Sequence, residues 1–118
     1  MFDDVLRRIL KEVEGTRCVL LAGMDGVVVA AAVADDGPAP DVVAASLADL
    51  FRRVAVAHSD AGLLPPREFT SGGGREQAAL IAVTAQYLLM AVLDGIGGLG
   101  RTRFELRKAA DALQTELS

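Results

Sequence analysis

The apolar positions near the start of the chain predict an amphipathic helix over residues 2–14. Apolar side chains recur there every three or four positions, and charged side chains fill the opposite face. Asp3 and Asp4 lie where the positive end of the helix dipole favours carboxylates. Gly15 follows the last periodic residue, so we expect the helix to end there.

Two apolar, β-branched runs follow, and they predict strands at about 17–23 and 27–34. The Asp25-Gly26 pair between them is a strong hairpin signal, because glycine accepts the positive φ that tight turns require. Neither run alternates between apolar and polar positions. A strand that is apolar on both faces needs cover on both faces, so we expect helices above and below the sheet.

A long helix is expected at about 42–61, with Asp41 as its N-cap and Gly62 at its end. Its polar side chains form one narrow line, and its apolar arc is wider than a single sheet covers. Dimerisation through this helix is the simplest explanation for the apolar side chains that the sheet does not cover. The expected interface consists of Val43, Leu47, Leu50, Phe51 and Val54, together with Phe69 from the next strand.

The second half of the chain predicts three more strands and a final helix. A short strand at 67–71 follows two prolines, so we expect it at a sheet edge, with Gly72–Gly74 as a turn. Residues 75–95 read as two strands joined near 85–87, and residues 99–117 read as a helix. The order α-β-β-α-β-β-β-α predicts an α+β fold.

Composition adds limits on the class of protein. A length of 118 residues predicts a single domain over 1–118, and the 52% apolar share suggests surface that a partner covers. A net charge of −4 argues against a nucleic-acid binder. Cys18 is alone, which excludes an intrachain disulfide and favours the cytoplasm. We see no signal peptide and no apolar run long enough for a membrane span.

Gly95, Gly97 and Gly100 match the spacing of a dinucleotide-binding fingerprint. Such a site requires a strand–helix–strand unit with parallel strands, and the sequence supplies no further strand after the last helix. We therefore interpret the glycines as a corner and expect no cofactor. Arg101 and Arg103 at the helix start are candidates for holding an anion, and the alternative is a solvated basic turn.

Other catalytic chemistry is poorly supported. His58 fits a packing or surface role better than that of a general base, and Cys18 fits a small buried hydrophobe. No cluster of cysteines and histidines has metal-ligand spacing, so we expect no metal. Gly72–Gly74 lacks the lysine and hydroxyl residue of a phosphate-binding loop. An enzyme is the least favoured class.

Three segments together resemble the Roadblock/dynein light-chain family, in its bacterial MglB-like branch. They are the hairpin "VLLAGMDGVVVAAA", the alanine-rich helix "VVAASLADLFRRVAVA" and the ending "LGRTRFELRKAADAL". The matching positions in the ending are Leu99, Gly100, Arg103, Leu106, Arg107 and Ala110. The resemblance covers almost the whole chain, and it rests on the order and spacing of these segments.

The resemblance implies a five-stranded antiparallel sheet, with the long helix on one face and the two terminal helices on the other. It implies a homodimer in which the central helices meet and the third strands pair. It also implies a platform that binds a small Ras-like GTPase and has no catalytic residue of its own, with a sensor kinase system as a further possible partner. By this analogy Gly100 serves backbone shape, and Arg101, Arg103 and Arg107 are candidates for contact with an acidic partner.

Two questions stay open at this point. The sequence lacks the terminal extension of some GTPase-activating members, so stimulation of hydrolysis and a scaffold role are equally compatible with it. The alternative class is a profilin- or PAS-like sensory domain that holds a small ligand. Such a site needs convergent polar groups, and Thr84 and Gln86 are nearly the only candidates between Ala78 and Leu93.

Overall fold

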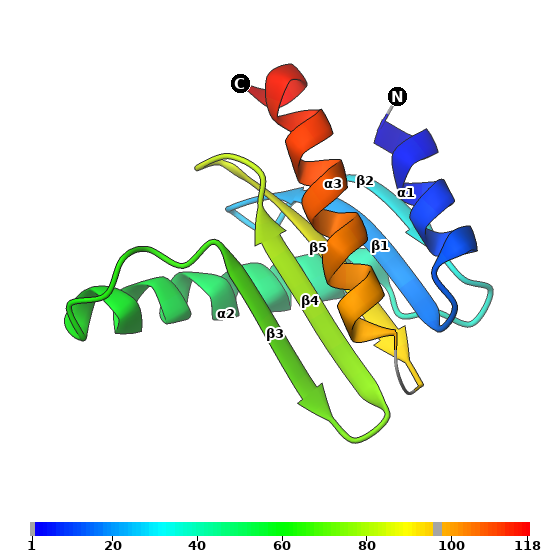
Figure 1. Ribbon diagram of the computed structural model, residues 1–118, viewed down its shortest axis with the longest axis horizontal. Coiled ribbons are helices and arrows are strands. Elements are labelled where there is room, and N and C mark those ends of the chain that lie inside the picture. Colours follow the sequence, from blue (N-terminus) through cyan, green and yellow to red (C-terminus); the bar gives the residue numbers. More distant parts are fainter. Residues whose placement is uncertain (1, 96–97) are drawn as a thin grey trace.

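The computed structural model describes residues 2–95 and 98–118, which form a five-stranded antiparallel sheet with helices on both faces (Figure 1). The strand order is β2-β1-β5-β4-β3. The elements are α1 (Phe2–Glu12), β1 (Thr16–Gly23), β2 (Val28–Val33), α2 (Pro40–Asp60), β3 (Glu68–Gly73), β4 (Glu76–Ala82), β5 (Tyr87–Asp94) and α3 (Leu99–Leu117). The predicted fold class and element order are confirmed.

The sheet separates two apolar layers, because its strands are apolar on both sides. α1 and α3 cover one face, where Leu6 and Leu106 pack with Leu21 of β1. α2 covers the other face, where Phe51 packs with Leu20 and Met90. Figure 1 shows α1 and α3 together in front of the strands and α2 behind them. The prediction of cover on both faces is therefore confirmed.

The β1–β2 hairpin turns at Asp25-Gly26, as its sequence predicts. Gly26 has a φ of +87°, and the Asp25 carboxylate accepts a hydrogen bond of 3.1 Å from the Val27 N–H. The pairing register shifts between Leu21 and Ala22, which marks a bulge at this end of β2. The hairpin turn packs closely on α2: a Cβ added to Gly26 would lie 3.1 Å from the Ala45 Cα.

The predicted start of α2 is wrong by two residues. The helix begins at Pro40 with Ala39 as its N-cap, and no side chain caps it. Proline suits a first helical position because its φ is already helical and its missing N–H has no partner there. Asp41 lies in the first turn and does not act as the N-cap. Gly62, with a φ of +75°, follows the end of the helix as predicted.

β3 lies at the sheet edge, as predicted, but it is longer than expected. Gly72 and Gly73 pair with Gln77 and Glu76 of β4, so they belong to the strand and not to the turn. The turn comes later, at Gly74, which has a φ of +79°. The ladder of β4 overrides the weak strand propensity of glycine here.

The remaining boundaries agree with expectation to within one residue, except that α1 ends at Glu12, two residues before the predicted end. β4 and β5 are joined over 83–86, where the Gln86 N–H donates to the Thr84 hydroxyl at 3.1 Å. α3 spans the predicted residues, and Leu106, Ala110 and Leu113 are buried. Across the described ranges 2–95 and 98–118, no helix has the length and apolarity needed to cross a bilayer.

Candidate functional site

One side of α2 presents an apolar row of four residues. Its members follow one another at intervals of four, three and four positions, which places them on one side of a helix; they are Val43, Leu47, Leu50 and Val54. Leu50 is 36% exposed, and the other three are partly buried. The row is thus covered incompletely by its own protomer.

Phe51 differs from the other predicted interface residues. It is only 4% exposed and packs with Leu20 and Leu80 inside the protomer. The ring therefore belongs to the core of one chain and is not available to a second. Phe69 is partly buried against the same core at the start of β3.

The sheet is less covered on the β3 side of α2. The helix packs mainly on β1, β2 and β5, and its C-terminal end projects past the strands on the β3 side (Figure 1). A shallow trough of about 360 Å³ lies over β3 and β4. Its lining includes Ser71, Gly72, Gly73, Gln77, Ala78 and Val92. Short side chains leave this part of the sheet accessible.

Exposed apolar side chains continue beyond α2. Val56 near the helix end is exposed, and so are Leu63 and Leu64 in the following loop. Sequence reasoning misses the two leucines, because they fall between a helix-ending glycine and two prolines and are interpreted only as part of a loop. Two adjacent leucines in a loop are an available signal for surface that a partner covers.

The arginines of α3 contact the edge strand. The Arg107 Nε donates to both carboxylate oxygens of Glu68, at 2.9 and 3.0 Å. Arg103 lies 3.8 Å from the same carboxylate, while Arg101 is exposed. A further ion pair of 3.4 Å joins Arg67 and Asp111. These contacts fasten β3 to α3, so two of the three arginines predicted to meet a partner already have a carboxylate beside them.

The glycine motif does not form a dinucleotide site. β5 is antiparallel to both of its neighbours, so no parallel strand–helix–strand unit precedes α3. Gly95 has a φ of +114°, whereas Gly97 lies outside the described residues. Gly100 is helical, and a Cβ added there would meet nothing within 4 Å. The prediction that Gly100 serves backbone shape is therefore wrong.

The remaining candidate side chains, His58 and Cys18, have structural roles. The His58 Nδ1 lies 2.9 Å from the Leu64 carbonyl oxygen, so the ring fixes the loop after α2. Cys18 is fully buried in β1, as predicted for a small hydrophobe. In the part of the chain that the structure describes, no three metal-ligating side chains come together.

Cys18 gives a pH-dependent prediction. Burial removes water from the thiol and raises its pKa above the ordinary value of 9.0. The unfolded thiol ionises from about pH 9 while the folded thiol keeps its proton. The contribution of Cys18 to the free energy of unfolding is therefore constant below that pH and falls above it. Cys18→Ala should remove this part of the alkaline loss in urea melts between about pH 8 and 10.5. An unchanged pH profile in the variant would contradict the assignment.

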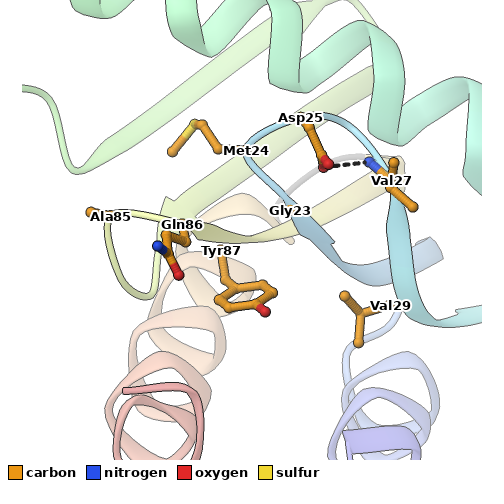
Figure 2. A pocket seen from close by; sticks show the side chains of 8 residues that line it. All are labelled: Gly23, Met24, Asp25, Val27, Val29, Ala85, Gln86 and Tyr87. Carbon is orange, nitrogen blue, oxygen red and sulfur yellow. Dashed lines mark hydrogen bonds between the residues drawn. The ribbon is translucent and has the colours of Figure 1, made fainter.

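A second trough, of about 440 Å³, lies at the tip of the β1–β2 hairpin. Figure 2 shows Val29 and Tyr87 projecting from the same side of the strands, with Gly23 between them. The Asp25 carboxylate faces the turn and bonds to Val27, which leaves the Gln86 amide and the Tyr87 hydroxyl as the polar side-chain groups of the trough. Such an open, mostly apolar trough is a poor cavity for a small polar ligand.

Known proteins resemble this chain in structure. No family model matches the sequence, and no curated protein matches it. A solved structure described as MglB with a tetrameric arrangement superposes with a TM-score of 0.87 and 26% identity, over 97% of this chain and 85% of the other. The gliding protein MglB of Thermus thermophilus superposes with a TM-score of 0.85 and 25% identity, over 97% of this chain and 86% of the other. The chain has the fold of an MglB-like Roadblock protein.

More distant structures share this Roadblock fold. A Roadblock/LC7 domain from Streptomyces avermitilis superposes with a TM-score of 0.84 at 16% identity, over 98% of this chain and 96% of the other. Profilin II of Acanthamoeba castellanii superposes with a TM-score of 0.70 at 18% identity, over the whole of both chains. These likenesses concern the fold alone, and they agree with the predicted Roadblock/profilin-like class.

Proposed function

We propose that this protein is a non-enzymatic homodimer that binds a small Ras-like GTPase in bacterial signalling, as a regulator or a scaffold. The MglB neighbours support a place among gliding-motility GTPase regulators. The observation that carries the proposal is the apolar row on α2, which lies beside an open sheet face. In this proposal residues 1–118 act as one Roadblock-like domain in the cytoplasm.

The proposed dimer joins the α2 rows and the β3 edges of two copies. Just before β3, the Arg67 carbonyl accepts from the Ala82 N–H of the neighbouring strand at 2.8 Å. Since ladder bonds alternate along a strand, the N–H groups of Thr70 and Gly72 point away from β4. An antiparallel second β3 satisfies these groups and brings the two α2 rows together across the two-fold axis. Val43, Leu47, Leu50 and Val54 with Phe69 then form the seam.

The proposed contact with the GTPase lies on the basic side of α3. Arg101, Arg103 and Arg107 are its charged members, and Phe104 adds an exposed ring. The Lys108 Nζ lies 5.3 Å from the centre of that ring. An exposed aromatic surrounded by cations suits a partner surface that presents carboxylates around an apolar spot. Arg103 and Arg107 are paired with Glu68 within the protomer, so Arg101 is the arginine of this group most available to a partner.

Co-purification with small Ras-like GTPases of the same organism tests the proposal. We expect binding that depends on the bound nucleotide, because switch segments of such GTPases change with it. Arg101→Glu should weaken binding about tenfold through charge reversal at the contact. Lys11→Glu makes the same charge change at an exposed residue of another helix, α1, and serves as the control. Absence of binding in every nucleotide state would contradict the proposal and favour the sensory alternative.

A further inference from the structure

The sheet has a second free edge, formed by β2. Among the strands that the structure describes, β2 is last in the sheet and pairs with β1 alone, and α1 and α2 lie against its two faces. The Ala34 N–H donates to the Arg17 carbonyl of β1 at 2.9 Å. Because ladder bonds alternate, the N–H and C=O groups of Ala31 and Val33 point away from β1. An edge with free backbone groups is a template for another strand.

β2 lacks most of the features that usually protect an edge strand. It contains no charged residue and no proline, and its valines are accessible: Val27 in the preceding turn is 63% exposed and Val29 is 46% exposed. The bulge lies at the hairpin end, and Ala30–Val33 continue in regular register with β1. Protected edges instead carry lysine, proline or bulges along their length.

The edge continues into the trough at the hairpin tip. Val29 of β2 and Val27 before it line this trough together with Tyr87 (Figure 2). A volume of about 440 Å³ accommodates an apolar side chain from a strand that runs along β2. Backbone pairing and a side-chain pocket are the two elements of recognition by strand addition.

The segments of chain on either side of β2, residues 24–27 and 34–39, carry only acidic charges. Between Cys18 and Phe51 the sequence contains five aspartates and no lysine or arginine. Asp25 precedes β2, and Asp35 and Asp36 follow it. Asp36 contacts Arg17 at 2.9 Å, whereas Asp25 and Asp35 are both exposed. A segment with basic residues on both sides of an apolar centre complements this edge.

We propose that β2 binds an extended segment of a partner protein as a sixth strand. The segment has β-branched residues at its centre and lysine or arginine at both ends, and it places one apolar side chain in the trough. The choice of a foreign segment over a second copy rests on the proposed function: with β3 already self-paired, self-pairing of β2 as well would produce an open-ended sheet.

A peptide titration of the full ¹⁵N-labelled chain tests this inference. The probe is the peptide Lys-Arg-Val-Thr-Ile-Thr-Val-Arg-Lys, and the matched control replaces its four basic residues with glutamate. We expect the basic peptide to protect the Ala31 and Val33 amides from hydrogen exchange and to bind at least about tenfold more tightly than the control. No protection at these amides, or equal affinity for both peptides, would overturn the proposal.

Two variants separate edge pairing from a general effect on the fold. Ala31→Pro removes an outward N–H and leaves the β1 ladder intact, and Val29→Lys places a cation on the edge. Each should weaken peptide binding about tenfold, while the exposed Leu64→Lys should not. Unchanged binding by Val29→Lys, or protection of Thr70 and Gly72 in place of Ala31 and Val33, would contradict the proposal. The sedimentation mass of the same samples reports the dimer separately, so a monomer that binds the peptide contradicts only the proposed function.

Discussion

Leu50→Glu should convert the dimer into a folded monomer. Leu50 is the most exposed member of the apolar row on α2, so the substitution disturbs little within one protomer. In the proposed seam it places two carboxylates, one from each copy, close together, while the neighbouring Arg53 is already paired with Asp49 at 3.1 Å. A buried, unpaired charge costs several kcal/mol, so we expect the dissociation constant to rise by a factor of about 100 or more. Sedimentation velocity and circular dichroism measure association and fold in the same sample.

Val42→Glu is the matched control for this prediction. Val42 is 61% exposed on the same helix, but it lies outside the apolar row. The control introduces the same charge on the same helix, and the dimer should persist. A Leu50→Glu dimer of unchanged affinity would show that the seam lies elsewhere. Loss of the dimer in both variants would show that a general effect on α2 is responsible.

Gly15→Ala should strongly destabilise the protomer. Gly15 links α1 to β1 with a φ of +88°, where side chains other than glycine are strained by about 1 kcal/mol or more. A Cβ at this position would also lie 2.6 Å from the Asp94 carbonyl oxygen, closer than real contacts allow. The Asp94 N–H donates to the Gly15 carbonyl at 2.7 Å, so the two backbones cannot separate without losing that bond. We expect a total loss of about 2–5 kcal/mol.

Gly62→Ala separates the strain of a positive φ from the steric clash of an added Cβ. Gly62 has a φ of +75°, but a Cβ there would meet nothing within 4 Å. It should therefore show only the conformational part, about 1 kcal/mol. Urea unfolding at one protein concentration measures both variants, since association also affects apparent stability. Equal losses in the two variants would contradict the close approach of Gly15 to β5.

The sequence predicted the elements whose signals are local and repeated. The helix over 99–117 has a full apolar stripe, and the Asp25-Gly26 turn specifies its own hairpin through one carboxylate and one positive φ. Cover on both faces of the sheet also followed from the sequence, because strands such as β1 are apolar at consecutive positions. These features depend on neighbours within a few residues, so pattern reasoning reaches them.

The errors and omissions arise from contacts between distant residues. Gly72 and Gly73 form strand because β4 supplies a ladder, which glycine propensity does not reveal. Phe51 lies in the wide apolar arc of α2, and only the packed structure shows that its ring fills the protomer core. The contact between Glu68 and Arg107 joins residues 39 positions apart. No local pattern distinguishes such an arginine from one that awaits a partner.

Sedimentation equilibrium of the unmodified chain at micromolar concentration tests self-association most directly. We predict a species of twice the chain mass of 12.3 kDa, since the α2 row and the β3 edge are satisfied only by a second copy. A single species of 12.3 kDa throughout the concentration range would contradict the dimer, and with it the platform on which the GTPase proposal depends.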